Sequence, residues 1–175
     1  APDAVVIPAG HGSLLIGAFK GFQELLNAGY IERLPRLFAA QAAACAPLVK
    51  IWQEDLTALP EIYPTPTLAE GISIASPVRW KQMLAAVRES GGEAVSVGEE
   101  ALSPIIRALA GRGILVEPTS AVPFAAAESL WQMGKLVDCP VVVVPATGHG
   151  LKAADKLEKI LRLQLPLAGA PGAGK

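Results

Sequence analysis

Two short segments of the sequence place a histidine between two glycines, directly after a run rich in valine. Val5–Ala9 leads into Gly10–Gly12, and Val142–Thr147 leads into Gly148–Gly150. Backbone N–H groups at the start of a helix attract anions, and glycine lets a phosphate approach them closely. The segment from Gly10 to Leu14 is therefore predicted to cradle an anion, although its glycines could equally serve a tight turn between a strand and a helix.

The first segment differs from three better-known loops of related chemistry. The dinucleotide-binding fingerprint needs a third glycine where this chain has Leu15, and an acidic residue where the second predicted strand ends in Gln41. A P-loop would continue with Gly-Lys-Ser/Thr, which does not follow here. A nucleophile elbow at Ser13 would also need glycine at the position of Leu15.

The two histidines raise the question of a metal site. His11 and His149 alone are too few ligands for zinc, so Cys45, Glu70 or Glu117 would have to supply a third. We therefore expect no metal. The two histidines are expected to help position a ligand.

Strands and helices alternate along the chain. Short β-branched runs predict strands, and apolar residues at helical spacing predict helices. The predicted strands are 5–7, 36–41, 94–97, 113–116 and a buried run of valines at 140–145. The predicted helices are 13–27, 47–52, one that begins with Ser76 as its cap and ends at the glycine pair 91–92, then 99–109, 120–133 and 153–163.

This alternation is typical of parallel strands joined by helices. We predict an α/β fold, a three-layer sandwich with a mostly parallel sheet, as a single domain over residues 1–165 followed by a flexible tail at 166–175. Loops that follow parallel strands meet at the carboxyl edge of the sheet, where such folds bind ligands. Both glycine-histidine loops are expected at that edge.

Composition narrows the function classes. Of the 175 residues, 51% are hydrophobic, and the 15 Lys and Arg nearly balance the 16 Asp and Glu. That balance argues against a nucleic-acid binder or a basic membrane patch. Two cysteines make no disulfide framework, and no apolar run approaches the roughly 18 residues that a membrane span needs. The first residues do not read as a secretion signal, so a cytoplasmic protein is expected.

Four segments resemble the C-terminal half of threonine synthases, within the fold-type II pyridoxal-phosphate enzymes. They occur in the family's order and cover nearly the whole chain. The segments are Pro8–Ser13 with Phe19–Phe22, Glu70–Ile72 with Ser76, Pro77 and Trp80, Glu117–Ala121, and Thr147–Lys152. The resemblance implies the large, cofactor-binding lobe of such an enzyme, with pyridoxal phosphate as its cofactor.

The resemblance also implies roles for individual residues. Thr147 would hydrogen-bond the pyridine nitrogen of the cofactor, which leaves the ring a weaker electron sink than an acidic partner would. Glu117, Ser120 and His149 would support the site, although Glu117 could simply favour the start of a helix. The residues whose backbone amides would hold the cofactor phosphate are Gly10, His11, Gly12, Ser13 and Leu14.

Two departures from the family pattern matter. The lysine that bonds covalently to the cofactor lies in the family's N-terminal half, which this chain lacks, so no catalytic residue is expected here. Lys152 is nearest to the predicted site, but the resemblance places it outside the chemistry. His11, Leu14 and Ser76 stand where the family often has asparagine, which puts the exact substrate in doubt.

The leading expectation is a lobe of a threonine-synthase-like lyase that converts O-phospho-L-homoserine to L-threonine and phosphate. The chain alone is expected to be inactive and to need a missing N-terminal lobe or a split subunit. A related threonine or serine dehydratase is an alternative. A non-catalytic lobe that binds phosphate-bearing ligands is another. Apolar surface that a missing lobe would cover predicts self-association, for example as a homodimer.

Overall fold

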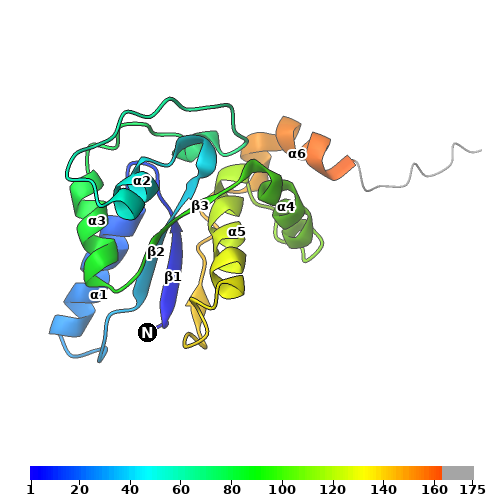
Figure 1. The fold of residues 1–175 in the computed structure, drawn as a ribbon. Helices are drawn as coiled ribbons and strands as arrows, with labels where there is room; N and C mark the ends of the chain where they lie inside the picture. The colour runs from blue at the N-terminus through cyan, green and yellow to red at the C-terminus, as the bar shows by residue number, and fades with distance from the viewer. Residues whose placement is uncertain (163–175) are drawn as a thin grey trace, which may run out of the picture.

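The computed structural model describes residues 1–162, which form a parallel sheet with helices on both faces (Figure 1). The fold class is therefore the predicted α/β sandwich of three layers. In chain order the elements are β1 (Ala4–Pro8), α1 (Ser13–Asn27), β2 (Arg36–Ala42), α2 (Pro47–Glu54), α3 (Trp80–Glu89), β3 (Ala94–Val97), α4 (Leu102–Ala110), α5 (Pro118–Gln132), β4 (Val142–Val143) and α6 (Ala154–Arg162). Short 3-10 turns lie at 43–45, 70–72, 99–101 and 150–153. The predicted tail at 166–175 lies outside the described residues.

The sheet has the strand order β3-β2-β1-β4, and every neighbouring pair is parallel. Val5 lies opposite Leu37, and Ala4 lies opposite Val142. Parallel strands covered on both faces read as continuous apolar runs, which explains why β1 and β2 lack polar alternation. The central strands β1 and β2 are thus the rigid support for the loops that follow them.

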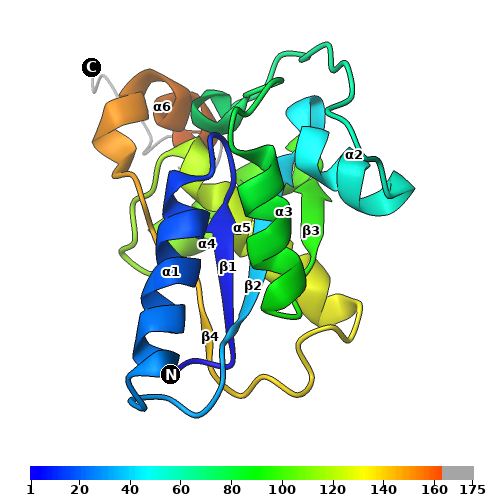
Figure 2. The ribbon, with the colours of Figure 1, turned by 90° about the vertical axis from the view of Figure 1, so that its left-hand side faces the viewer.

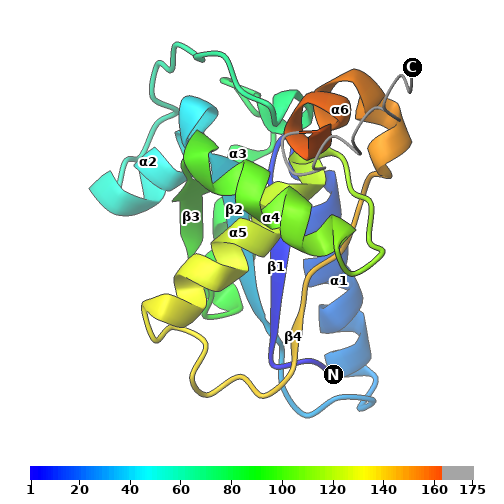
Figure 3. The ribbon, with the colours of Figure 1, turned by 90° about the vertical axis from the view of Figure 1, so that its right-hand side faces the viewer.

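Alternate residues of the strands point into two separate cores. Val5 and Leu37 pack with α1, α2 and α3 on one face, which Figure 2 shows from the front. Val6 and Phe38 pack with α4 and α5 on the other face, seen in Figure 3. Within residues 1–162, no helix combines the length and apolar character needed to cross a membrane.

The predicted strand at 113–116 is wrong. Gly113 has a positive φ of 79° and closes α4, with its N–H donating to the carbonyl of Ala110. Val116 then forms one isolated antiparallel bridge to His149. The segment therefore runs beside the second glycine-histidine loop and does not enter the sheet.

The predicted buried strand at 140–145 is much shorter than expected. Only Val142 and Val143 pair with β1, and Val143 is 44% exposed. Pro140 and Pro145 have no N–H to donate, so the ladder cannot extend through either position. β4 is an edge strand with one neighbour, which explains the exposure of its side chains.

Several helix boundaries also differ from the prediction. Ser76 does not cap a helix, because residues 76–79 form a turn in which Trp80 N–H donates to the carbonyl of Pro77, and α3 begins at Trp80. The stretches predicted to begin helices at 99 and 153 instead start with 3-10 turns. α5 begins two residues earlier than predicted, since Pro118 suits the first helical position.

Candidate functional site

The first glycine-histidine loop joins β1 to α1 at the carboxyl edge of the sheet. Gly12 caps α1 in a left-handed conformation, and its carbonyl accepts the first helical hydrogen bond from Ile16 at 2.9 Å. Among residues 1–162, no hydrogen bond uses the N–H groups of residues 10–14. These amides lie at the positive end of the α1 dipole, where an anion is favoured. They meet the requirement for the predicted cradle, and anion binding itself stays a prediction.

Both glycines of this loop are packed too closely for a side chain. A Cβ on Gly12 would lie 2.3 Å from Cγ of Met83, and the φ of 84° is one that glycine alone adopts readily. A Cβ on Gly10 would lie 3.2 Å from Cα of Ile72. Glycine at these two positions therefore lets Ile72 and Met83 pack closely against the backbone of the loop.

Gln41 holds the base of this loop, a role that the sequence did not reveal. Its Nε2 donates to the carbonyl of Ala9 at 2.9 Å. Its Oε1 accepts from the amides of Leu48 and Val49 at 2.9 and 3.2 Å, which satisfies two open donors at the start of α2. Gln41 is fully buried. A polar residue at the end of an otherwise apolar strand was the feature of the sequence that could have indicated this role.

The second loop is built by hydrogen bonds to the start of α5. Gly148 N–H donates to Oγ of Ser120 at 2.7 Å, and that Oγ lies 2.8 Å from Oγ1 of Thr147. The carbonyl of Gly148 accepts from Glu117 N–H, and Gly150 N–H donates to Leu115. Most polar groups of this loop are thus used internally, while Thr147 is exposed.

Glu117 caps α5 and packs its carboxylate against Gly148, where a Cβ would lie only 1.9 Å from Oε1. Its Oε2 lies 3.8 Å from Nζ of Lys152. The acidic side chain therefore supports the second loop as well as the start of the helix. This position is consistent with both roles considered for it.

The two histidines behave differently. Nδ1 of His149 accepts from Leu151 N–H at 3.2 Å, so His149 caps the 3-10 turn that follows it. His11 is exposed, and within the described chain its side chain makes no hydrogen bond. Across residues 1–162, His, Cys, Asp and Glu form no cluster of three that could hold a metal.

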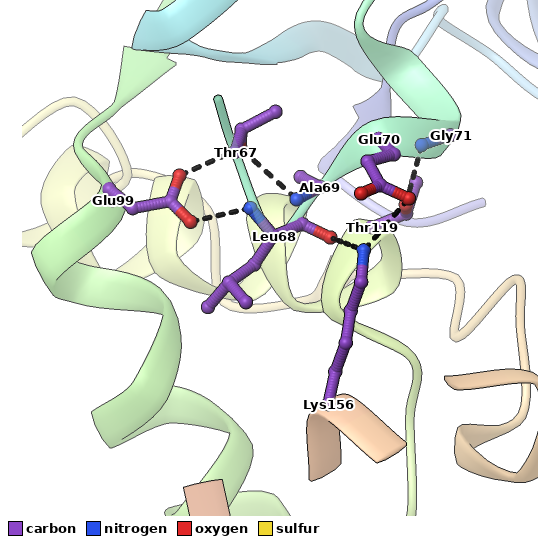
Figure 4. Close-up of polar contacts among 8 residues, drawn as sticks. All are labelled: Thr67, Leu68, Ala69, Glu70, Gly71, Glu99, Thr119 and Lys156. Carbon is purple, nitrogen blue, oxygen red and sulfur yellow. Dashed lines mark hydrogen bonds and ion pairs between the residues drawn. The ribbon is translucent and has the colours of Figure 1, made fainter. Parts of the chain in front are cut away.

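Residues 67–72 form a strap that contacts the start of α5 and the first loop. Figure 4 shows the polar contacts of this strap. Gly71 N–H donates to Oγ1 of Thr119 at 3.1 Å, next to Ser120. Ile72 packs against Gly10 in the first loop. In the part of the chain that the structure describes, no hydrogen bond joins the two loops directly. The strap is the connection between them.

Hydrogen bonds hold one end of the strap, and an ion pair holds the other. Glu99 accepts from Thr67 Oγ1 at 2.7 Å and from Leu68 N–H at 2.6 Å (Figure 4). Lys156 of α6 lies 2.8 Å from Oε2 of Glu70 and also donates to the carbonyl of Leu68. Lys152 and Lys156 are therefore engaged by acidic partners. A cavity of about 450 Å³ opens between the strap, the start of α5 and the start of α6.

Cys45 lies just after β2 and is fully buried. Burial raises the pKa of its thiol above the ordinary value, and a hydrogen bond with Ser73 offsets part of that increase. A thiol with a raised pKa is protonated at neutral pH and is a poor nucleophile. Cys45 is therefore part of the packing beneath the edge and not a reactive group.

The edge of the sheet thus offers open backbone amides from one loop and an exposed hydroxyl from the other. Glu117, Ser120, Thr147 and His149 come together as predicted, whereas His11 stands apart from them. Such a donor set suits a ligand with an anionic group and a neutral hydrogen-bonding group. Among these side chains, His11 is the one without a partner within the described residues.

Comparison with known proteins places this geometry in a family. Residues 1–159 match the family model described as pyridoxal-phosphate dependent enzyme. A threonine synthase of Methanosarcina acetivorans is 38% identical over 153 residues, which cover 86% of this chain. The chain spans 38% of that relative's length.

Solved structures agree on the fold. The threonine synthase of Escherichia coli superimposes with a TM-score of 0.68 at 21% identity, covering 94% of this chain and 37% of that one. The processed form of threonine deaminase isoform 2 from Solanum lycopersicum gives a TM-score of 0.69 at 21% identity, covering 97% of this chain and 45% of that one. At these identities the likeness concerns the fold.

Proposed function

Because the chain belongs to the family of pyridoxal-phosphate dependent enzymes, we propose that it forms the cofactor-binding lobe of a threonine-synthase-like enzyme. The complete enzyme converts O-phospho-L-homoserine to L-threonine and phosphate. The similarity to threonine synthases over most of the chain supports this choice of reaction. The family to which the chain belongs uses pyridoxal phosphate.

The observation that carries the proposal is the set of open amides at the start of α1. Backbone N–H groups of Gly10, His11, Gly12, Ser13 and Leu14 bind the phosphate of the cofactor. Two features fit a phosphate: donors without partners among residues 1–162, and the dipole of a helix of 15 residues. The charge of the helix end complements that of the ligand.

Thr147 binds the pyridine nitrogen through its hydroxyl. Thr147 is an exposed residue, and its hydroxyl lies 2.8 Å from Oγ of Ser120. When bound, pyridoxal phosphate supplies an electron sink for bonds broken at the amino-acid substrate. The residues of this chain bind and orient the cofactor. Glu117 and His149 stabilise the conformation of the loop that carries Thr147.

The lysine that bonds to the cofactor comes from a second lobe. Lys20, Lys50, Lys81 and Lys156 lie on helices, Lys135 lies on the turn after α5, and Lys152 lies on the turn before α6. Lys152 and Lys156 pair with carboxylates. This chain spans only 38% of the length of the relative from Methanosarcina acetivorans, which leaves room for such a lobe. Alone, this chain is inactive.

Two neighbouring surfaces suit the second lobe. β4 pairs with β1 only, so one side of this strand has no neighbour within residues 1–162. The outer side of α1 exposes Leu14 and Leu25 beside the small residues Ala18 and Gly21, around a shallow cavity of about 650 Å³. In the absence of the second lobe, these apolar surfaces favour association of two copies.

A threonine or serine dehydratase is the second candidate, favoured by the fold shared with the tomato threonine deaminase. The two activities release different products from different substrates. The full gene product is expected to release inorganic phosphate from O-phospho-L-homoserine. Formation of 2-oxobutanoate from L-threonine as the dominant activity would instead identify the dehydratase.

Cofactor binding can be tested on this chain itself. Titration with pyridoxal phosphate, followed by absorbance, is expected to saturate reversibly, and inorganic phosphate should compete. Thr147→Val should weaken binding by about tenfold, the value of one hydrogen bond, while the exposed control Thr57→Val should not.

The remaining candidate, a non-catalytic lobe, makes a different prediction. It would bind inorganic phosphate with no preference for the cofactor, and neither threonine variant would matter. If neither this chain nor the full gene product binds pyridoxal phosphate, the proposed function is wrong.

A further inference from the structure

We propose that Ser120 is a positioning residue that holds the hydroxyl of Thr147 as a hydrogen-bond donor toward the bound ligand. The direction of the hydroxyl follows from the geometry of this chain. The identity of the acceptor rests on the proposed function. The two parts can therefore fail separately.

Ser120 occupies the third position of α5 and is fully buried. Its Oγ has two polar neighbours among residues 1–162. Gly148 N–H lies at 2.7 Å, and Oγ1 of Thr147 lies at 2.8 Å. The first distance is at the short end of the range for N–H···O bonds, and the second is ordinary for O–H···O bonds.

The hydroxyl proton of Ser120 has one available acceptor among the two neighbours of its Oγ. The amide of Gly148 is a donor and cannot accept it, which leaves Oγ1 of Thr147 as the acceptor. If Thr147 donated instead, Ser120 would carry a buried O–H without a partner, and the cost of removing that group from water would not be recovered. The favoured arrangement is therefore a donation from Ser120 to Thr147.

The result is a chain of donors that ends at the exposed hydroxyl. Gly148 N–H donates to Ser120 and Ser120 donates to Thr147, which leaves the proton of Thr147 available to an acceptor on the ligand. Hydrogen bonds aligned in series polarise one another, so the last O–H is a stronger donor than an isolated hydroxyl. A ring nitrogen with a free lone pair is the acceptor that suits it, whereas a protonated ring would present a second donor.

The charged groups beside this chain of donors do not reverse that preference. The carboxylate of Glu117 packs against Gly148, and Lys152 lies 3.8 Å from it. His149 uses Nδ1 to accept from Leu151. The nearest carboxylate is thus paired, and the hydroxyl of Thr147 is the group left to meet the ring.

The test is nitrogen NMR of pyridoxal phosphate labelled with ¹⁵N in its ring and bound to this chain. Protonation moves this resonance by a large amount, so the wild type should show the unprotonated position. Ser120→Ala should move the resonance toward the protonated position. Its affinity should fall by less than about threefold, because the phosphate contacts are intact.

Three further variants separate the explanations. Ser129→Ala, on the exposed side of the same helix, is the matched control and should behave as wild type. Ser120→Thr keeps the hydroxyl and should restore the wild-type resonance. Ser120→Cys, a weaker donor of similar size, should give an intermediate position and replaces the alanine variant if circular dichroism shows that variant unfolded.

Each outcome decides one question. Absence of cofactor binding by every form, full gene product included, overturns the proposed function. Binding in which Thr147→Val matches the wild type shows that the cofactor does not contact Thr147. A wild-type ring that is protonated, or a Ser120→Ala resonance identical to wild type while Thr147→Val shifts it, overturns the role of Ser120.

Discussion

The two glycine-histidine loops have the same three residues, but their backbones differ in how many hydrogen bonds they form within the protein. The loop at residues 10–12 leaves its amides without partners among residues 1–162, ahead of a helix of 15 residues. The loop at residues 148–150 uses its polar groups to bind Ser120, Glu117 and Leu115. One loop is therefore open to a ligand, and the other is a scaffold for the hydroxyl of Thr147.

The difference shows that a glycine-rich loop can bind a ligand only where its backbone N–H groups have no hydrogen-bond partner in the protein. In both loops glycine lets a neighbouring side chain pack closely against the backbone, but the chemical type of that side chain differs. At Gly12 the supporting neighbour is Met83, which leaves the amides free, whereas at Gly148 it is the carboxylate of Glu117. Binding chemistry is found by accounting for each backbone donor.

The largest contrast between the loops is expected from replacing one glycine in each. Gly12→Ala should destabilise the fold by about 2–4 kcal/mol, since it adds left-handed strain and a clash with Met83. It should also abolish phosphate binding. Gly148→Ala should cost about 1 kcal/mol, because the flexible end of Glu117 can move aside. Urea denaturation and phosphate titration measure both effects, and equal losses would remove the distinction.

A second contrast concerns the serine hydroxyls. Ser120→Ala should lower the free energy of unfolding by about 1–3 kcal/mol, because Gly148 N–H loses its acceptor. Ser13→Ala, in the first loop, removes an exposed hydroxyl without a partner in the described chain and should change stability by less than about 0.5 kcal/mol. Denaturant midpoints give the comparison. A larger effect at Ser13 would contradict it.

Inorganic phosphate should distinguish the loops without any mutation. At ten times its dissociation constant it should stabilise the chain by about 1.4 kcal/mol. Amide hydrogen exchange should slow most at residues 10–14. The amides of Gly148 and Gly150 are already bonded and should change less. Protection confined to the second loop would reverse the assignment of the anion site.

The smallest contrast is between the histidines. His149→Ala should cost about 1 kcal/mol, the usual value of a lost helix cap, because Leu151 N–H loses its acceptor. His11→Ala should stay within about 0.5 kcal/mol of wild type, as expected for an exposed side chain. Thermal unfolding of the two variants side by side is sufficient. Equal effects would show that His11 also makes a structural contact.

Local patterns predicted the framework of the fold well. β1, β2 and β3 lie within one residue of their predicted ends, and α1 matches from Ser13 to Asn27. These elements have buried runs or clear helical spacing, so their own sequences determine their type. The segment at 113–116 failed because a short apolar run does not specify its partner, and here the partner is the loop at His149.

The candidate site was predictable only in part for the same reason. Glycine spacing and the family resemblance indicated the two loops, but not that Ser120 is the group that orients Thr147. The role of Gln41 was not predicted, because its three hydrogen-bond partners come from a loop and a helix that no local pattern connects to it. The strap at 67–72 depends on Glu99 and Lys156, which lie far along the chain.

The pairing of β1 with β4 has a consequence for synthesis. Ala4 lies opposite Val142, so this part of the sheet joins positions separated by most of the described chain. Contacts between such distant residues close large loops and are slow to form. On the ribosome, the first loop emerges early, but the hydroxyl that completes the site arrives only when β4 has been translated. A nascent chain therefore cannot present both halves of the site until folding is nearly complete.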